Sequence, residues 1–453
     1  MVDTPRIVVA GTHSGVGKTT VASGLMAALS SEGFRVAPFK VGPDFIDPSY
    51  HTLAAGGPGR NLDAFLSGPE LMGPLFAHGA RGADIAVIEG VMGLFDGKGG
   101  GDLASTAHVA RLLEAPIVLV VDARAMSRSV AAMVHGYATF DPRSRIAGVV
   151  LNRVGSRVHE TILRDAIKPL GIPVLGVVGR NDEIHTPDRH LGLVPVAERR
   201  EEAARSLDAL GKVISRSLNL DSMVRLARSA APVGVEAWSP ESRDLDRSVG
   251  TRVAVATGPS FSFLYRENLE LLDGAGAEVV TFDPTTEEEL PAGTDALYLG
   301  GGFPETYAEA LSTNWRMRES VQAFAAGGRP VVAECGGLLY LVRELDGHPM
   351  CGVLDAEATM TDRLTLGYRE ARALADSPLA DRDANVRGHE FHYSAVEPGA
   401  GQRPAWELAG RGQEGFVAGG VHASYLHTHW AATPELPRRL VREASRSATG
   451  VWV

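Results

Sequence analysis

The chain has 453 residues, of which 44% are hydrophobic and 22% charged, and its formal net charge is −11. Its length exceeds what one hydrophobic core usually supports, so we expect two domains. The interspersed acidic charge argues against nucleic acid as a partner, which calls for a basic patch. No apolar run approaches the roughly 20 residues of a membrane span, and the N-terminus shows no secretory pattern. We therefore expect a cytoplasmic protein without a membrane segment.

Short apolar runs alternate with helical spacers and indicate parallel sheets covered on both faces. The first series of runs begins at Arg6, Arg35, Asp84, Pro116, Ile146 and Ile172. A second series begins at Arg252, Glu278, Asp295 and Arg329. Between the two series lies a segment without apolar runs, rich in proline, serine and charged residues. We interpret residues 229–250 as a linker between an N-terminal domain, 1–228, and a C-terminal domain, 251–453.

The stretch GTHSGVGKTT follows the first apolar run and is typical of a phosphate-binding loop. Gly15 and Gly17 let backbone N–H groups converge on an anion, and Lys18 supplies a positive charge. Thr19 offers a hydroxyl to magnesium. Thr12 stands where the strict pattern has its first glycine. The candidate nucleotide-binding residues in this loop are Thr12, Gly15, Gly17, Lys18, Thr19 and Thr20.

Carboxylates follow the next two runs. FKVGPDFIDPSYH places Lys40, Asp44 and Asp47 after one run, and VIEGVMGLFDG places Glu89 and Asp96 after the other. Because an open α/β sheet gathers such loops at the carboxyl ends of its strands, we expect Asp47 and Glu89 to hold Mg²⁺ with the loop threonine. For each acid taken alone, a capping role stays open.

Two basic residues are candidates for binding an anionic substrate. Lys40 lies in the first of these acidic stretches, and Arg60 lies in GRNLD. Arginine suits such a role because its planar guanidinium recognises carboxylates. An ordinary solvated arginine is the alternative reading of Arg60.

Only two cysteines occur, too few for a disulfide framework or a zinc site of their own. In RPVVAECGGLLYLVREL an apolar strand runs directly into Cys335 and an amphipathic helix follows, which is the pattern of a nucleophile elbow. Small residues at Ala333 and Gly337 relieve crowding there. We expect the helix N-terminus to lower the thiol pKa and the Gly336 N–H to bind an oxyanion. Cys351 is interpreted as a buried apolar filler.

A cysteine nucleophile needs a base. GGVHASYLHTHW offers His422, His427 and His429, for which metal binding is the competing idea. The two-residue spacing without nearby cysteines disfavours a metal. A further cluster, RGHEFHYS at 387–394, either shapes an amino-acid pocket or packs beneath it.

Taken together, these motifs resemble those of the corrinoid a,c-diamide synthases, in the family's order and over nearly the whole chain. The motifs are GTHSGVGKTT, FKVGPDFIDPSYH, GRNLDAFL, IEGVMGLFDG, LNRVGS, LGGGFPE, ECGGLLYL, GHEFHYS and HASYLHTHW. The resemblance implies an N-terminal P-loop parallel-sheet domain, similar to dethiobiotin synthetase, that acts as an ATP-dependent amidoligase. It also implies a C-terminal class I glutamine amidotransferase α/β domain.

The resemblance implies a ligase that amidates the a and c acetate carboxylates of cobyrinic or hydrogenobyrinic acid in cobalamin biosynthesis. ATP and Mg²⁺ would convert each carboxylate to an acyl phosphate. Cys335 would release ammonia from L-glutamine, and the ammonia would travel along a shielded path. A corrinoid and L-glutamine are thus the expected partners, and a homodimer is left open.

Asp44 and Asp96 lie on loops near the phosphate end, so we expect them to position the substrate carboxylate or stabilise the phosphorylated intermediate. The resemblance suggests roles for further single residues. Asn152, in LNRV, would recognise adenine, with helix capping as the alternative. Gly301 and Gly302 would add an oxyanion donor to that of Gly336.

His427 is expected to be the base, because YLH aligns with the histidine at a strand end in related amidotransferases. The glutamate usual two residues later is replaced here by His429. The group that orients the base is therefore absent, a backbone group, or one of His389 and Glu390.

Three alternatives remain. A cobyric acid synthase or a nickel-sirohydrochlorin a,c-diamide synthase would keep the chemistry and change the acceptor, although GPDFIDPSYH and RGHEFHYS favour a,c-diamidation. A P-loop switch or partition ATPase with a degenerate amidotransferase module is disfavoured by Cys335 and His427. The sequence does not separate cobalt-bearing from cobalt-free corrins.

Overall fold

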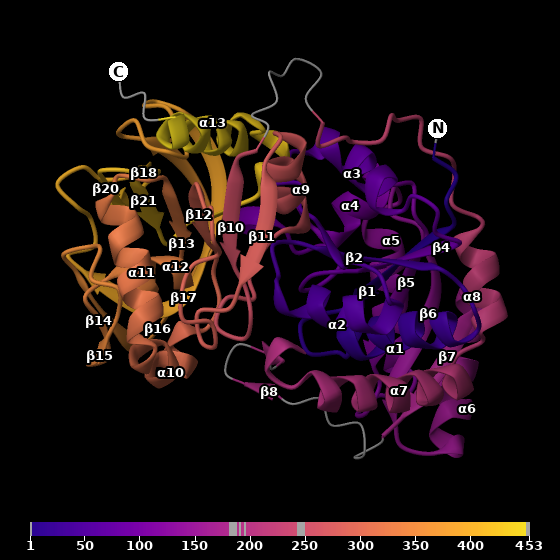
Figure 1. The fold of residues 1–453 in the computed structure, drawn as a ribbon. Coiled ribbons are helices and arrows are strands. Elements are labelled where there is room, and N and C mark those ends of the chain that lie inside the picture. The colour runs from indigo at the N-terminus through magenta and orange to yellow at the C-terminus, as the bar shows by residue number, and fades with distance from the viewer. Residues whose placement is uncertain (1, 181–187, 190–191, 194–195, 242–249, 450–453) are drawn as a thin grey trace. The chain divides into compact units, whose positions relative to one another are not determined.

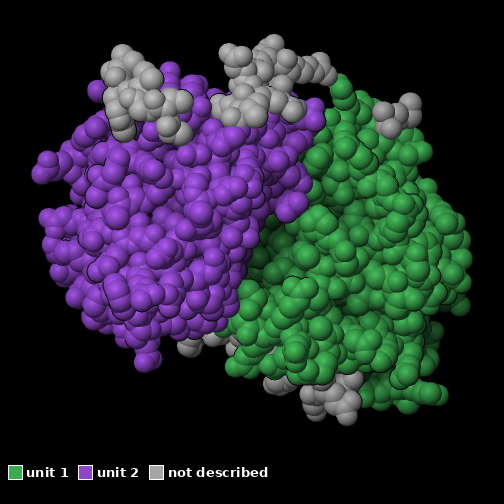
Figure 2. Space-filling model, in the orientation of Figure 1, with its two compact units in different colours: residues 1–238 green, residues 239–453 purple. Residues whose placement is uncertain are grey.

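The computed structural model describes residues 2–180, 188–189, 192–193, 196–241 and 250–449. It divides the chain into two compact units, Met1–Trp238 and Ser239–Val453, which Figure 2 distinguishes by colour. Trp238 still packs on the first unit, with its ring centroid 5.0 Å from that of His78. Within the described part of the chain, no helix has the length and apolarity needed to cross a membrane.

The first unit is built on a seven-stranded parallel sheet in the order β3-β2-β4-β1-β5-β6-β7. Its strands are β1 (Arg6–Gly11), β2 (Val36–Val41), β3 (Arg60–Leu62), β4 (Ile85–Glu89), β5 (Ile117–Asp122), β6 (Ile146–Val154) and β7 (Val174–Gly179). A separate antiparallel pair is β8 (Asp188–Arg189) and β9 (Gly192–Leu193). The predicted parallel sheet is confirmed. The three-residue β3 was not predicted because it is too short to form an apolar run.

Figure 1 shows helices on both faces of this sheet, with α1, α2 and α7 on one side and α3, α4 and α5 on the other. The α-helices are α1 (Lys18–Ser31), α2 (Ile46–Ala55), α3 (Met72–Gly79), α4 (Thr106–Leu112), α5 (Ser129–Phe140), α6 (Arg157–Ile167), α7 (Arg200–Ser217) and α8 (Leu220–Ala227). The 3-10 helices are η1 (Pro69–Leu71), η2 (Lys98–Gly100), η3 (Lys168–Leu170) and η4 (Val196–Glu198). Coverage of both faces explains why the strands read as continuous apolar runs.

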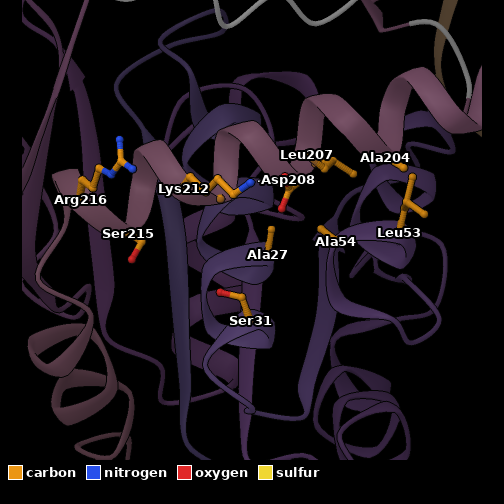
Figure 3. Close-up of a pocket in the computed structure, with 11 residues that line it drawn as sticks. Ala27, Ser31, Leu53, Ala54, Ala204, Leu207, Asp208, Lys212, Ser215 and Arg216 are labelled. Carbon is orange, nitrogen blue, oxygen red and sulfur yellow. Dashed lines mark hydrogen bonds and ion pairs between the residues drawn. The ribbon is translucent and has the colours of Figure 1, made fainter.

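A pocket of about 390 Å³ lies among α1, α2 and α7 (Figure 3). Ala27 and Ser31 line it from α1, and the ion-paired Asp208 and Lys212 line it from α7. The α1 residues of this pocket lie nine or more positions along the helix from Lys18. The pocket is therefore separate from the phosphate loop at the start of α1.

The second unit contains a six-stranded sheet in the order β11-β10-β12-β13-β21-β20, parallel except for β20. Its strands are β10 (Arg252–Ala256), β11 (Glu278–Phe282), β12 (Ala296–Leu299), β13 (Val331–Glu334), β20 (Phe416–Ala418) and β21 (Val421–Ser424). The second predicted α/β unit is thus confirmed.

A second sheet of this unit runs β15-β14-β16-β17-β22, with β18 paired to β16 and β19 to β18. Its strands are β14 (Glu344–Leu345), β15 (His348–Pro349), β16 (Glu357–Ala373), β17 (Asn385–Glu397), β18 (Trp406–Leu408), β19 (Gly412–Glu414) and β22 (His427–Thr428). The long pair β16 and β17 was not predicted. Much of β16 is solvent-exposed, so its sequence lacks the apolar run by which the other strands were found.

The helices of the second unit complete its core. They are α9 (Arg266–Gly274), α10 (Ala308–Thr313), α11 (Trp315–Ala326), α12 (Gly336–Leu341) and α13 (Glu435–Thr449), with the 3-10 helices η5 (Pro304–Tyr307) and η6 (Trp430–Ala432). α12 is buried along its whole length and starts directly after β13. This strand-to-helix junction positions Cys335.

Candidate active sites

The phosphate loop connects β1 to α1. Gly15 and Gly17 have φ angles of 79° and 97°, a left-handed conformation that other residues adopt only with strain. The Lys18 ammonium donates hydrogen bonds to the carbonyls of His13, at 3.2 Å, and Met92, at 2.6 Å. Burial, together with the nearby charge of another lysine, lowers the pKa of Lys18 to about 8. This loop presents backbone N–H groups and a cation at a helix N-terminus, as an anion site requires.

Asn152, at the carboxyl end of β6, supports the loop from the neighbouring strand. Its Nδ2 donates a hydrogen bond to the Val16 carbonyl at 2.8 Å. A Cβ on Gly17 would lie 2.2 Å from the same Nδ2, so the glycine is needed for this close approach. The structure thus places the Asn152 amide against the loop backbone. Adenine recognition by this residue stays a prediction.

Hard oxygen donors converge beside the loop. Thr19 Oγ1 donates to Glu89 Oε1 at 2.6 Å and lies 3.5 Å from Asp47 Oδ2. Lys40 Nζ lies 2.5 Å from Asp47 Oδ2 and 3.0 Å from Glu89 Oε1. Thr20 follows on α1, half-buried. These hydroxyl and carboxylate oxygens are the donor types that magnesium prefers.

Glu89 is held from its other side by a residue that the sequence analysis did not single out. His51 Nε2 lies 2.6 Å from Glu89 Oε2, and both side chains are fully buried. Burial raises the pKa of Glu89, but the opposing effects of Lys40 and His51 outweigh it and hold that pKa below its usual range. The pKa of Asp47 is instead raised to about 7, first by burial and then by neighbouring carboxylates. Glu89 is therefore the firmly ionised member of the cluster.

The other acids have local partners. Asp44 Oδ1 accepts from the Ile46 N–H at 2.7 Å and so caps α2. Asp96 Oδ2 accepts from the Gly93 N–H at 2.9 Å. Arg60 is buried in β3, and Lys40 is buried in its ion pairs. In the described residues, no group of three or more His, Cys, Asp or Glu is placed to hold a metal without other ligands.

In the second unit, β13 runs into Cys335, whose φ of 48° and ψ of −99° form a strained turn before α12. The Cys335 N–H donates to the Ser424 carbonyl at 2.8 Å. A Cβ on Gly337 would lie 2.2 Å from the Leu299 carbonyl oxygen, so a larger residue would clash. This geometry is that of a nucleophile elbow.

The pKa of the Cys335 thiol differs from the expectation of a lowered value. Burial raises it well above the ordinary value, and the charge of Glu305 adds to the rise. The Gly336 N–H donates a hydrogen bond to the sulfur and favours the thiolate, but this effect is smaller than burial. The resting nucleophile is therefore a thiol rather than a preformed thiolate.

The glycine loop after β12 lies at this elbow. A Cβ on Gly336 would lie 2.9 Å from the Gly302 nitrogen. A Cβ on Gly301 would lie 2.3 Å from Cε1 of His427. The structure thus brings together the elbow, both predicted oxyanion glycines and the predicted base.

His389 lies opposite His427 where β17 pairs with β22. Their ring centroids are 4.9 Å apart, with ring planes at 87°. Burial, and then the proximity of His389, lowers the pKa of His427 well below its ordinary value, so this imidazole is neutral. Glu390 is instead ion-paired with Arg369. Of the two groups considered for orienting the base, His389 is the one whose ring the structure places against His427.

The other two histidines have different surroundings. His429 Nε2 lies 3.4 Å from Glu267 Oε2 on α9. His422 Nδ1 lies 3.1 Å from the Ser377 hydroxyl. The described contacts of these two rings are with residues outside the elbow.

Sequence reasoning missed His51 and Glu334, which lie next to predicted site residues. Asp47 and His51 are four residues apart on α2, so helical spacing could have placed them on one face. Glu334 is a carboxylate at the end of a fully buried strand, which is uncommon enough to be a signal.

Comparison with known proteins agrees with this geometry. Residues 7–194 match the model of the CobQ/CobB/MinD/ParA nucleotide binding domain, and residues 252–435 match the CobB/CobQ-like glutamine amidotransferase domain. A hydrogenobyrinate a,c-diamide synthase from Streptomyces coelicolor is 56% identical, with 98% of each chain covered. The chain belongs to the a,c-diamide synthase family.

Other members of the family carry two names. A hydrogenobyrinate a,c-diamide synthase from Mycobacterium bovis is 52% identical and covers 97% of this chain and 98% of its own. A cobyrinate a,c-diamide synthase from Syntrophotalea carbinolica is 44% identical, and the match covers 96% of this chain and 98% of its own. The predicted resemblance and the predicted pair of domain types are confirmed.

Proposed function

We propose that this chain uses ATP and L-glutamine to amidate the a and c acetate carboxylates of hydrogenobyrinic acid, a step of cobalamin biosynthesis. The observation that carries the proposal is the convergence of Cys335, His427 and the glycine loop in a chain that also has an intact phosphate loop. Five relatives named hydrogenobyrinate a,c-diamide synthases are 50–56% identical to the chain, against 42–44% for three relatives named cobyrinate a,c-diamide synthases. This difference favours the cobalt-free corrin as the acceptor.

In the first unit, Lys18 and the loop N–H groups would bind the ATP phosphates. Thr19, Asp47 and Glu89 would hold Mg²⁺, whose charge stabilises the phosphates. The γ-phosphoryl group would bond to a carboxylate oxygen of the substrate as ADP leaves. Ammonia would then attack the carbonyl carbon and expel phosphate, a far better leaving group than oxide.

Several residues of the first unit would serve that transfer. Asp44 and Asp96 would position the reacting carboxylate, with Lys40 and Arg60 contributing positive charge on the substrate side. Lys40 would act indirectly, because its ammonium is buried and offsets part of the negative charge of Asp47 and Glu89 that an anionic substrate would meet.

In the second unit, the Cys335 thiol would pass its proton to neutral His427 as sulfur attacks the side-chain amide carbon of glutamine. The N–H groups of Gly302 and Gly336 would bind the oxyanion. His427 would return the proton to the departing ammonia, and water would then release glutamate from the thioester. We infer that His389, whose ring lies against that of His427, orients the His427 ring.

We further propose a cytoplasmic enzyme with domains 1–228 and 251–453, joined by a segment whose first part, up to Trp238, packs on the N-terminal domain. The nature of the reactants supports the cytoplasmic assignment. A homodimer is the assembly to test by light scattering.

The deciding experiment is mass spectrometry after incubation with ATP, Mg²⁺, glutamine and hydrogenobyrinic or cobyrinic acid. We expect two amidations, faster on hydrogenobyrinic acid. Cys335→Ala should abolish amidation from glutamine while retaining amidation from excess ammonia. Lys18→Ala should lose both. No product on either corrin would overturn the proposal.

The second cysteine provides a matched control. Cys351 is also buried, next to Tyr340, and belongs to the hydrophobic core. Cys351→Ala should keep glutamine-dependent amidation. Equal loss in both cysteine variants would contradict Cys335 as the nucleophile.

A further inference from the structure

A buried contact joins the neighbours of the nucleophile and the base. Glu334 immediately precedes Cys335, and Thr428 immediately follows His427. Thr428 Oγ1 donates a hydrogen bond to Glu334 Oε1 at 2.6 Å, and the Thr428 N–H donates to the same oxygen at 3.2 Å. Both residues are almost completely buried. One carboxylate oxygen thus holds both the side chain and the backbone of Thr428.

This contact connects two different sheets. Glu334 ends β13 in the six-stranded sheet, whereas Thr428 belongs to β22 in the sheet that contains β16 and β17. The backbone hydrogen bonds of the six-stranded sheet reach as far as Ser424, which pairs with Glu334 three residues before His427, and those of the second sheet hold His427 itself. The Glu334–Thr428 contact joins the chain to the end of β13 again just after His427, so the backbone of His427 is held to the strand of Cys335 on both sides.

The Thr428 side of the link is rigid. Its carbonyl accepts from Asn268 Nδ2 at 2.9 Å, and its hydroxyl accepts from Trp430 Nε1 at 2.8 Å. Asn268 Oδ1 also accepts from the Trp430 N–H at 2.9 Å. Because the hydroxyl accepts from Trp430, its single proton is directed to Glu334. The rotamer of Thr428, and with it the backbone next to His427, is therefore defined.

Stability alone does not account for a carboxyl group at this place. Burial raises the pKa of Glu334 to about 7 despite three donors, which shows that the desolvation penalty exceeds the gain from its hydrogen bonds. An apolar side chain in this core would avoid that penalty. Unlike an apolar side chain, the carboxyl group accepts two hydrogen bonds from Thr428, and these directional bonds hold the threonine in one orientation.

We propose that Glu334 is a positioning residue which, through Thr428, fixes His427 relative to the Cys335 sulfur for glutamine hydrolysis. The inference rests on the proposed glutaminase activity of this site. It concerns two residues whose side-chain hydrogen bonds go to neither Cys335 nor His427.

The test compares two losses of a hydrogen bond to the same carboxyl group. Thr428→Val removes the hydroxyl next to the base. Tyr298→Phe removes the other side-chain donor, which lies 3.1 Å from Glu334 Oε2 and does not belong to the β22 segment. For each variant we would measure glutaminase kcat and KM, the rate of ammonia-dependent amidation, and Tm.

We expect Thr428→Val to lower glutaminase kcat by roughly ten- to a hundredfold, since small misplacements of reacting groups have effects of this size. KM for glutamine and the ammonia-dependent rate should stay near the parental values. Thr428→Ser, which keeps the hydroxyl, should restore kcat. Tyr298→Phe should lower Tm while retaining kcat.

Equal kcat for Thr428→Val and the parent, or equal losses of kcat in Thr428→Val and Tyr298→Phe, would overturn the positioning role. If Thr428→Val fails to fold, Thr428→Ala removes the same hydroxyl with a smaller side chain, and Thr428→Ser remains the variant that keeps it. A folded parent that does not hydrolyse glutamine would overturn the proposed function itself, and this inference with it.

Discussion

His389 and His427 face each other across the β17–β22 pairing, with ring centroids 4.9 Å apart and ring planes nearly perpendicular. His429, two residues along, lies instead 3.4 Å from Glu267. We therefore expect His427→Ala to lower glutaminase kcat by roughly a hundredfold or more, as the loss of a general base does. His429→Ala should have a milder effect on kcat.

Steady-state glutaminase assays on both variants would rank the two histidines, with Tm as the control for folding. The ammonia-dependent amidation rate should survive in both, because the first unit is untouched. A larger loss of kcat in His429→Ala at equal Tm would transfer the role of base to His429.

Gly301 has no room for a side chain beside the base. A Cβ there would lie 2.3 Å from His427 Cε1, so Gly301→Ala must displace the ring. We expect glutaminase kcat to fall by roughly a hundredfold, since displacement by about 1 Å suffices for such a loss. Gly399→Ala is the matched control, because a Cβ there meets its nearest neighbour at 3.7 Å. Parental kcat in Gly301→Ala would place His427 outside the reaction.

Glu89 is held by Thr19, Lys40 and His51, so its charge is fixed at one position. Glu89→Gln keeps the size and removes the charge, and we expect amidation to fall more than tenfold, or about 1.4 kcal/mol of barrier. Calorimetric titration of the variant with ATP, with and without Mg²⁺, should show that Mg²⁺ no longer increases the affinity for ATP. Glutaminase activity should remain.

The control for Glu89 is an acid at the opposite end of the same strand. Asp84 precedes β4 and pairs with the exposed Arg35, so Asp84→Asn should keep both the amidation rate and the effect of Mg²⁺ on ATP affinity. An unchanged amidation rate in Glu89→Gln at saturating Mg²⁺ would remove Glu89 from the metal site.

The raised pKa of Glu334 predicts how the free energy of unfolding changes with pH. Between its ordinary pKa of 4.5 and its folded value of about 7, the native state holds more protons than the unfolded state. The free energy of unfolding contributed by this group therefore falls as pH rises through that window, by up to about 3 kcal/mol, and is constant above it. Glu334→Gln should lack this decline.

Urea denaturation of parent and variant at about pH 4.5, 6 and 8 would measure the difference. The stability of Glu334→Gln relative to the parent should rise with pH up to about 7. Glu319→Gln, at an exposed position on α11, is the control and should show no such trend. A parallel pH dependence in parent and Glu334→Gln would contradict a raised pKa.

Much of the fold could be predicted because its central strands are buried on both faces. Val8 and Val332, for example, lie in short continuous runs of buried apolar residues, and such runs identify a strand without knowledge of its neighbours. β16 could not be found this way. Its polar, partly exposed residues are held by pairing with β17, whose position depends on the folded sheet.

Some features of the candidate sites could likewise be predicted from the sequence, and others could not. Lys18 and Cys335 stand at strand-to-helix junctions whose local sequence dictates their geometry. The contact of Glu334 with Thr428 spans 94 residues of sequence, and no local pattern signals it. The thiol pKa was also misjudged, because the depth of burial that raises it is a property of the assembled core.

The protonated resting state of Cys335 affects how readily this cysteine is oxidised or alkylated. Peroxide and alkylating reagents react with thiolates rather than thiols. A buried cysteine whose proton leaves only when its sulfur attacks an amide offers these reagents little to react with. The free enzyme should therefore keep its glutaminase activity during exposure to oxidants that inactivate thiolate enzymes.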